Sequence, residues 1–305
     1  MQIVTDLTSF APFCGGVVSI GNFDGVHRGH QQILKRLVSR AREKNVPAVA
    51  MTFDPPPVAL IAPQRVPPRL STVARKAELM SWLDVDCLLV YPTTREFLSL
   101  TAQQFFEQVI GSQLQSCGLV EGPNFFFGKN RSGNIDLLAS MTATAGLDFE
   151  VVPAQLDEGE TISSSGIRQM IAGGQFDRAV SWLGHPYRLT GIVSPGAARG
   201  TGIGFPTANL NEILTLVPHP GVYAATTTIE GKSYPAAVHI GGNPTFAEES
   251  TKVEVHVIGF QGDLYGRELS IDLTCHLRQV QRFSSVEALQ EQLQKDIAAV
   301  MASLP

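Results

Sequence analysis

Residues 17–41 read VVSIGNFDGVHRGHQQILKRLVSRA, and they predict a strand, a loop and a helix in that order. Val17–Ile20 is a short apolar run typical of a buried strand, and a loop containing glycines follows at residues 21–30. Beyond the loop, apolar residues repeat at helical spacing: Ile33, Leu34, Leu37, Val38 and Ala41. This order is typical of the first unit of a parallel α/β sheet.

The same alternation continues to about residue 183. Further strands are expected at residues 46–53, 85–91, 118–121 and 149–152. Helical patterns lie between them, at residues 71–83, 102–114 and 135–145. Strands that alternate with helices imply right-handed crossovers, so we expect a Rossmann-like domain whose parallel sheet is covered on both faces.

The pattern changes at about residue 184, which predicts two domains, 1–183 and 184–305. Residues 221–229 and 232–240 read as a hairpin, and residues 253–257 and 269–277 alternate apolar with polar side chains. Such strands indicate an antiparallel sheet with one buried face, closed into a small barrel. Ser284 and Glu287 have the spacing of a capping box at the start of a C-terminal helix.

The composition describes an acidic globular chain. Its 305 residues carry a net charge of −5, with 44% hydrophobic and 17% charged residues. That is enough apolar material for packed cores and too little charge for a disordered chain. The chain has no overall basic field, so nucleic acid and anionic membranes are not expected partners. No apolar run has the length of about 18 residues that a membrane-spanning helix needs.

The cysteines and the N-terminus indicate a cytoplasmic protein. Cysteines stand at positions 14, 87, 117 and 275, with no C-x-x-C pair and no zinc spacing. We therefore expect no disulfides and a reducing compartment. Residues 1–13 contain no Lys or Arg, so they do not read as a signal peptide.

The loop at residues 21–30, GNFDGVHRGH, has the features of a nucleotide site. Its glycines allow the backbone to approach phosphates, and the following helix offers free N–H groups and its positive dipole end. His27 and His30 are suited to hydrogen-bond an α-phosphate as negative charge builds there. The alternative is a tight turn with two surface histidines, but the strand, glycines and histidines agree on the first interpretation.

Two later segments fit the same site. In ISSSGIR, residues 162–168, Ser164 and Ser165 precede Arg168, and hydroxyls with a guanidinium suit a departing pyrophosphate. Alone, this segment reads equally as a helix N-cap. In GPNFFFG, residues 122–128, Asn124 and Phe125 are suited to orient a flat ring, although the three phenylalanines are equally compatible with a core.

A second glycine loop lies in the β-rich half, GTGIGFPTAN at residues 200–209. It lacks the Lys of a G-x-x-x-x-G-K-[ST] loop. Thr207 and Asn209 share a face of an extended segment, and their oxygens suit Mg²⁺. Glu254 lies on the strand face opposite the valines of residues 253–257; on the inner or rim face of a barrel it is suited to accept a proton from a hydroxyl. The alternative for the segment of Thr207 and Asn209 is an ordinary turn, and the alternative for Glu254 is a solvent-facing glutamate.

The loop at residues 21–30 resembles the H-x-G-H class of nucleotidyltransferases. With GPNFFFG, ISSSGIR, GFPTAN, GGNPTF at residues 241–246 and the Glu254 strand, the chain resembles prokaryotic bifunctional riboflavin kinase/FMN adenylyltransferases, the FAD synthetases. The resemblance covers nearly the whole chain. It implies that residues 1–183 transfer AMP from ATP to FMN, giving FAD and pyrophosphate. It also implies that residues 184–305, as a six-stranded barrel, phosphorylate riboflavin with ATP.

The resemblance also implies the roles of individual residues. Catalysis is assigned to His27, His30, Arg168 and, as the kinase base, Glu254. ATP binding is assigned to Gly21, Asn22, Phe23, Asp24, Gly25, Ser164, Ser165, Gly200, Gly202 and Gly204. Flavin contacts are assigned to Asn124, Phe125 and Arg278, and Mg²⁺, which accompanies ATP, to Thr207 and Asn209. The chain departs from the family pattern at Pro56, where the family has His, and at Thr201, where it often has Arg or Lys.

Two other functions are compatible with parts of these motifs. One is a different adenylyl- or cytidylyltransferase that carries the barrel as a regulatory addition; the loop around His27 does not exclude it, but Thr207 and Asn209 with Glu254 argue against it. The other is a flavin-binding sensor with decayed sites, against which the intact motif residues argue. Incubation with riboflavin, ATP and Mg²⁺, followed by separation of the flavins, discriminates all three.

Overall fold

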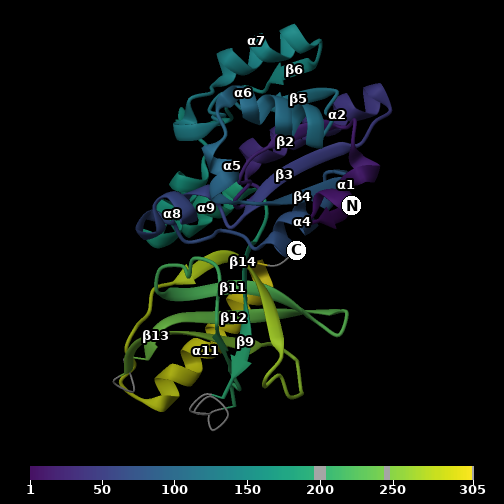
Figure 1. Cartoon of the computed structure of the whole chain (residues 1–305). Helices are drawn as coiled ribbons and strands as arrows, with labels where there is room; N and C mark the ends of the chain where they lie inside the picture. Colours follow the sequence, from purple (N-terminus) through teal and green to yellow (C-terminus); the bar gives the residue numbers. More distant parts are fainter. Residues whose placement is uncertain (196–203, 244–247, 304–305) are drawn as a thin grey trace. The chain divides into compact units, whose positions relative to one another are not determined.

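The structure, a computed structural model, describes residues 1–195, 204–243 and 248–303 (Figure 1). The chain forms two compact units, which are described separately. Unit 1 comprises Met1–Pro67 and Ser71–Ser163, and unit 2 comprises Pro68–Leu70 and Ser164–Pro305. Gly200, Thr201 and Gly202 lie outside the described residues, as does part of the GGNPTF segment.

Unit 1 is built on a six-stranded parallel sheet in the order β1-β4-β3-β2-β5-β6. The strands are β1 (Gln2–Val4), β2 (Val17–Ile20), β3 (Ala48–Asp54), β4 (Cys87–Pro92), β5 (Gly118–Glu121) and β6 (Asp148–Val151). The parallel α/β sheet is confirmed, and β2 and β5 have the predicted bounds. The edge strand β1 was not predicted, because three residues are too short to show an alternation.

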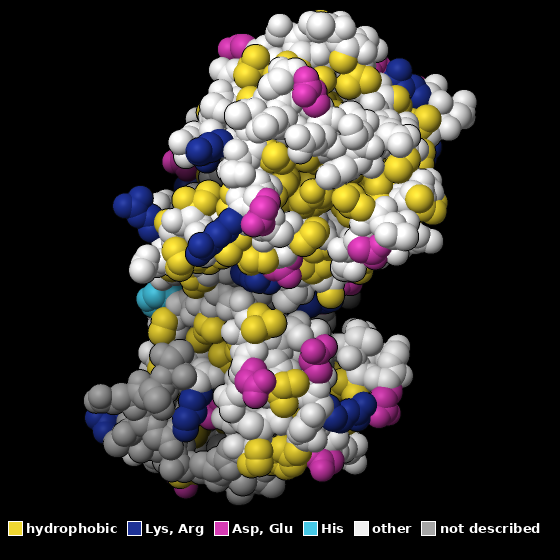
Figure 2. Space-filling model, viewed as in Figure 1, with side chains coloured by type: hydrophobic (Ala, Val, Ile, Leu, Met, Phe, Trp, Pro, Cys, Tyr) yellow, Lys and Arg dark blue, Asp and Glu magenta, His cyan; other side chains and the backbone are white. Residues whose placement is uncertain are grey.

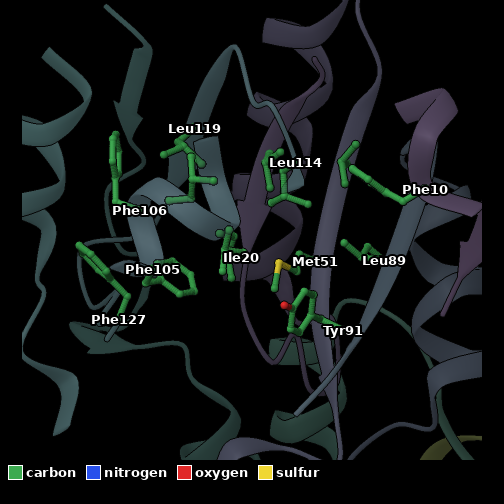
Figure 3. Packing of buried hydrophobic residues seen from close by; sticks show 14 of the residues in the cluster. Phe10, Ile20, Met51, Leu89, Tyr91, Phe105, Phe106, Leu114, Leu119 and Phe127 are labelled. Carbon is green, nitrogen blue, oxygen red and sulfur yellow. The ribbon is translucent and has the colours of Figure 1, made fainter. Parts of the chain in front are cut away.

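Helices cover both faces of this sheet (Figure 1). On one face, α2 (Arg28–Lys44) and α4 (Val73–Ser81) pack against the strands. On the other face lie α1 (Leu7–Phe10), α6 (Ala102–Gln104), η3 (Phe105–Gln113) and α7 (Ile135–Ala145). Figure 3 shows this second core, where Phe105 and Phe127 pack beside Ile20 and Met51. The helix predicted at residues 102–114 is thus α6 followed by a π-helical segment.

The remaining elements of unit 1 are short. They are η1 (Ala11–Phe13), α3 (Pro57–Ile61), η2 (Pro63–Arg65), α5 (Arg95–Ser99), η4 (Lys129–Arg131) and the hairpin of β7 (Leu156–Asp157) with β8 (Glu160–Thr161). Pro56 precedes α3 with φ −64° and ψ 146°, the extended conformation that consecutive prolines predict.

Glu121 joins β5 to β2 through its side chain. The backbone pairing of the two strands ends at Val18 and Leu119. Beyond that point the buried carboxyl group of Glu121 accepts a hydrogen bond from the backbone N–H of Ile20, at 2.8 Å. Burial raises the pKa of Glu121 well above its ordinary value of 4.5, and the hydrogen bond from Ile20 lowers it less. Folding therefore favours the protonated form of this side chain at the end of β2.

Unit 2 contains a closed antiparallel barrel of six strands in the order β10-β13-β12-β11-β14-β9. The strands are β9 (Tyr187–Ser194), β10 (Ala208–Asn211), β11 (Gly221–Ile229), β12 (Lys232–Asn243), β13 (Glu248–Val257) and β14 (Glu268–Arg278). The predicted barrel and its hairpin are confirmed, since Ile229 pairs with Lys232 and Gly221 with Ile240. The C-terminal helix α11 (Val286–Ser303) packs on β11, β12 and β14. Its start is capped by Ser285, which accepts from Ala288 N–H, and not by Ser284.

Two helices join the barrel in unit 2, α8 (Ser164–Ala172) and α9 (Phe176–Leu183). The ring of Phe176 is 1% exposed and packs edge-on against Tyr223, at 4.9 Å between centroids. The carboxylate of Asp177 accepts a hydrogen bond from the backbone N–H of His276 at 2.8 Å. The compact unit therefore begins at Ser164, before the change of sequence pattern at residue 184.

Two further observations concern the surface. No helix among the described residues is long and apolar enough to cross a membrane. Figure 2 shows Lys and Arg side chains interspersed with Asp and Glu on the viewed face, as the charge balance of the sequence leads one to expect.

We expect Glu121→Gln to stabilise the protein increasingly with pH. The unfolded chain loses the Glu121 proton near pH 4.5, whereas the folded chain loses it only at a higher pH, because burial raises the pKa. The free energy of unfolding therefore falls as the pH rises from the unfolded pKa towards the folded pKa. Each pH unit costs up to about 1.4 kcal/mol. Glutamine does not titrate and still accepts from Ile20. Urea unfolding at pH 5 and pH 8 measures the gain, with the exposed Glu107→Gln as control; a gain that is equal at both pH values would contradict the prediction.

We expect a fragment of residues 164–305 to be more stable than one of residues 184–305. The shorter fragment lacks Phe176, and loss of a buried phenylalanine typically costs about 3–5 kcal/mol. It also leaves the backbone N–H of His276 without Asp177. Urea unfolding followed by circular dichroism compares the two fragments, and equal midpoints would show that α9 does not support the barrel.

Candidate active sites

The loop at residues 21–27 leaves the carboxyl end of β2 and enters α2 through a sharp turn. Three of its residues have left-handed backbone conformations: Phe23 at φ 45°, Gly25 at φ 81° and Val26 at φ 39°. Glycine adopts this conformation without strain, but Phe23 and the β-branched Val26 do not. The loop therefore needs contacts from the surrounding structure to keep its shape.

Lys76 and Thr52 hold the first part of the loop. Nζ of Lys76 donates to the carbonyl oxygen of Asn22 at 2.6 Å, and Oγ1 of Thr52 donates to the same oxygen at 3.1 Å. Lys76 lies on α4 and is 8% exposed, and Thr52 lies on β3 and is fully buried. A buried ammonium group is thus placed directly beneath the loop.

Ser71, just before α4, holds the second part of the loop. Its hydroxyl group accepts from the backbone N–H of Gly25 at 2.8 Å. In return, Oδ1 of Asp24 accepts from the backbone N–H of Ser71 at 3.0 Å and from its hydroxyl at 3.2 Å. Ser71, Lys76 and Thr52 were not predicted as site residues, because no local motif marks them and their contacts are distant in sequence.

His27 is the N-cap of α2. Its Nδ1 accepts a hydrogen bond from the backbone N–H of His30 at 3.3 Å. Because Nδ1 accepts, the neutral ring carries its proton on Nε2. The ring folds over Gly29, where a Cβ atom would lie 3.2 Å from Cε1 and Nδ1 of His27. The glycine of the H-x-G-H motif therefore makes room for the capping histidine.

The ring of His30 stacks on that of His27, with centroids 3.6 Å apart and planes inclined by 18°. Phe23 packs edge-on against the other side of His30, at 5.3 Å. Nδ1 of His30 is buried, and none of the described residues forms a hydrogen bond with it. Burial, then His27 and Lys76, hold the pKa of His30 well below its ordinary value of 6.5. Two stacked imidazoles with a buried polar atom thus meet at a helix N-terminus, an arrangement suited to an anion.

The three phenylalanines of residues 125–127 have different environments. Phe127 belongs to the core, 5% exposed and 5.5 Å from Phe105. Phe125 is half-buried and stacks on Phe127 at 5.7 Å. Phe126 is exposed, with the guanidinium group of Arg131 above its ring at 4.4 Å. The aromatic segment is therefore partly core and partly surface, and Asn124 lies exposed beside it.

The ISSSGIR segment spans the end of unit 1 and the start of unit 2. In unit 1, Ile162 is buried, and its carbonyl oxygen lies 3.6 Å from the position that a Cβ on Gly29 would take. In unit 2, Ser164 and Ser165 form the first turn of α8, and Nε of Arg168 donates to the carbonyl oxygen of Pro68 at 2.7 Å.

Three of the residues predicted for the second site, Asn209, Glu254 and Arg278, lie in one row across the outer face of the barrel. Asn209 pairs with Glu254, Glu254 with His239, His239 with Val222, and Val222 with Arg278. The valines at 253 and 255 fill the barrel, so Glu254 points outward. Glu254 thus lies on the strand face opposite the valines, as the alternation predicts, and that face is the outer one because the valines occupy the inside.

Helix α11 fixes one end of this row. Nε and Nη2 of Arg278 donate to the two carboxylate oxygens of Asp296, at 2.8 and 2.7 Å. Gln292 also donates to Asp296, at 2.8 Å. Asp296 is 4% exposed, so this bidentate pair anchors the helix to β14 at a buried position.

The other end of the row carries the predicted magnesium ligands. Leu210 is buried in the barrel and Asn209 pairs with Glu254, so Asn209 shares the outward face with Glu254, and Thr207 lies just before strand β10. Their oxygens suit Mg²⁺, which takes few protein ligands beside waters and nucleotide phosphates. Among the described residues no group of three or more His, Cys, Asp or Glu could hold a metal ion. Three glycines of the second glycine loop were predicted to bind ATP, and Gly204 is the one among them that lies in the described part of the chain. It is exposed.

We expect the capping role of His27 to be separable from its imidazole chemistry. His27→Ala removes the acceptor for the N–H of His30 and should lower the stability of unit 1 by about 1 kcal/mol. His27→Asn should keep the stability, because asparagine is a preferred N-cap. Urea unfolding followed by circular dichroism measures both variants, and an Ala variant as stable as the unmodified protein would exclude the capping role.

In comparisons with known proteins, two family models match separate parts of the chain. A family model described as FAD synthetase matches residues 11–166, and one described as riboflavin kinase matches residues 183–304. The bifunctional riboflavin kinase/FMN adenylyltransferase of Pseudomonas fluorescens is 38% identical, covering 99% of this chain and 97% of the relative. The enzyme of the same name from Escherichia coli K12 is 37% identical, covering 94% and 92%.

A solved structure is also similar over the full length. A crystal structure described as a macrolide-efflux protein from Streptococcus pneumoniae has a TM-score of 0.85 at 30% identity, covering 98% of both chains. The family matches and the curated relatives show that the chain belongs to the bifunctional riboflavin kinase/FMN adenylyltransferases, the FAD synthetases, which convert riboflavin to FMN and FMN to FAD.

Proposed function

We propose that residues 1–183 carry the FMN adenylyltransferase site and residues 184–305 the riboflavin kinase site. The observation that carries the first assignment is the stacked pair of His27 and His30 at the N-terminus of α2, with a buried atom that lacks a partner. The outward row of Asn209, Glu254 and Arg278 supports the second assignment.

In the adenylyl transfer, a phosphate oxygen of FMN attacks the α-phosphorus of ATP. A new phosphoanhydride bond forms as the bond to the β-phosphate oxygen breaks, and pyrophosphate leaves. The neutral imidazoles of His27 and His30 donate hydrogen bonds to the α-phosphate oxygens as charge develops there. Because Nδ1 of His27 accepts from His30, Nε2–H is the donor of His27.

The other predicted residues bind the substrates of this reaction. Residues 21–25 bind ATP, because the loop held by Lys76 and Ser71 presents its backbone beside the histidines. Ser164, Ser165 and Arg168 bind the departing pyrophosphate. Asn124 and Phe125 orient the flavin, for which the half-buried ring of Phe125 is suited.

In the kinase reaction, Glu254 accepts the proton of the riboflavin 5′-hydroxyl group. The hydroxyl oxygen forms a bond to the γ-phosphorus of ATP as the bond to ADP breaks. Thr207 and Asn209 would hold the Mg²⁺ that accompanies ATP, and the ion supplies charge neutralisation at the phosphates. Gly200, Gly202 and Gly204 approach the phosphates, and Arg278, fixed by Asp296, orients the flavin.

The substrates are small molecules, ATP with riboflavin or FMN, and the FMN made by the kinase is the substrate of the adenylyltransferase. We assign both reactions to the cytoplasm. The four free cysteines support this location, because a reducing compartment leaves thiols unpaired.

We expect His30→Ala and Glu254→Gln to separate the two activities. His30→Ala should slow FMN-to-FAD conversion about 10²–10³-fold, because it removes a donor to developing charge, and leave riboflavin phosphorylation unchanged. Glu254→Gln should slow riboflavin phosphorylation about 10²–10⁴-fold, because the amide cannot accept the proton, and leave FMN-to-FAD conversion unchanged. Chromatography of the flavins, with riboflavin or FMN supplied, measures both steps.

Each variant serves as the other's control. Equal loss of both activities in one variant would indicate misfolding or a shared site. A near-normal kinase rate in Glu254→Gln would remove Glu254 from the mechanism, and a near-normal adenylyl transfer rate in His30→Ala would do the same for His30.

A further inference from the structure

Glu254 has a histidine beside it that no sequence motif marked. His239 on β12 and Glu254 on β13 are direct cross-strand partners, and Nδ1 of His239 lies 4.0 Å from Oε2 of Glu254. Val238 and Ile240 on either side of His239 are fully buried in the barrel. The imidazole therefore projects onto the same outer face as the carboxylate.

Nδ1 of His239 is buried and has no hydrogen-bond partner among the residues that the structure describes. A buried polar atom without a partner is costly, so it points to a partner that arrives or moves closer during function. The carboxylate of Glu254, on the neighbouring strand, offers an acceptor 4.0 Å from this atom. A normal hydrogen bond requires the two atoms to approach by about 1 Å, and catalytic hydrogen bonds are often long without substrate.

Burial favours the neutral form of the His239 ring over its charged form. Burial lowers the pKa of His239 below its ordinary value of 6.5; Glu254 raises it, Arg278 lowers it and Asp296 raises it, each by less than burial. A neutral imidazole has one N–H group, which can be carried on Nδ1. The row also leaves His239 little freedom, because Glu254 lies on one side of it and Val222 on the other.

We propose that His239 is a positioning residue of the riboflavin kinase reaction, which donates from Nδ1 to Oε2 of Glu254 and so directs Oε1 to the substrate hydroxyl group. The inference rests on the proposed role of Glu254 as base. During transfer the hydroxyl proton moves to Glu254, the oxygen–phosphorus bond forms and ADP leaves. His239 keeps its proton throughout, and its contribution is the orientation of the carboxylate.

The test compares His239→Leu with His239→Asn in the full-length enzyme. Leucine fills the space without a donor, whereas the asparagine amide places an N–H near the position of Nδ1. Riboflavin phosphorylation is measured at saturating ATP and Mg²⁺ with riboflavin varied. We expect the Leu variant to lose about 10- to 100-fold in kcat, the usual range for a hydrogen bond to a charged group, with little change in KM. The Asn variant should recover to within about threefold of the unmodified rate.

Two controls separate positioning from general damage to the barrel. Thr190→Ala removes another cross-strand contact of the barrel, the 2.8 Å hydrogen bond to Ser270, and should keep the kinase rate. The double variant His239→Leu with Glu254→Gln should be no slower than Glu254→Gln alone, because His239 acts through the carboxylate. Should the Leu variant fail to fold, His239→Val replaces it as an apolar, strand-compatible side chain.

Several outcomes would overturn the inference. They are a Leu variant that keeps its kcat, an Asn variant as slow as the Leu variant, or losses that add in the double variant. These outcomes differ from failure of the proposed base. If Glu254→Gln keeps the kinase rate, both the assignment of Glu254 as base and the role of His239 are wrong. If Glu254→Gln is slow while His239→Leu keeps its rate, only the inference about His239 is wrong.

Discussion

The carbonyl oxygen of Asn22 accepts two hydrogen bonds, from Lys76 and from Thr52, and the geometry of the adenylyltransferase loop depends on them. Left-handed conformations at Phe23 and Val26 are unfavourable by themselves, at a typical cost of about 1–3 kcal/mol each. The buried ammonium group of Lys76 is favourable only where a strong acceptor meets it. Loop and lysine therefore stabilise each other, and the result is a fixed entrance to α2 where His27 caps the helix and supports His30.

In the barrel, strand pairing instead of a loop places the residues of the proposed kinase site. Cross-strand register places Asn209, Glu254 and His239 side by side, with no loop needed to bring them together. Apolar side chains inside the barrel fix which face these residues occupy, since a shift of one residue would reverse every side chain. The Arg278–Asp296 pair then ties α11 to the same surface.

Local patterns predicted much of this arrangement. The H-x-G-H loop lies between a predicted strand and helix, and alternation along residues 221–240 was sufficient for the hairpin. Contacts between distant segments were not predictable in this way. Lys76 on α4 and Ser71 just before it contact the loop of residues 21–27 only through tertiary packing. His239 is next to Glu254 only because of the strand register in the barrel. Alternation predicted that Glu254 lies opposite the valines, but it left open whether that face is the inner or the outer face of the barrel, which the buried valines decide.

The assignment of α8 and α9 to unit 2 makes the two activities unequal in their resistance to heat. Ser164, Ser165 and Arg168, proposed for pyrophosphate, belong to the compact unit that contains the barrel. Melting of that unit removes the kinase surface and these three residues together, so neither reaction survives it. Melting of unit 1 removes the histidine loop but leaves the row on the barrel in place. With the sites as proposed, FAD formation therefore depends on the folding of both units, whereas FMN formation depends on unit 2 alone, so an enzyme in which only unit 1 has melted is expected to form FMN without converting it to FAD.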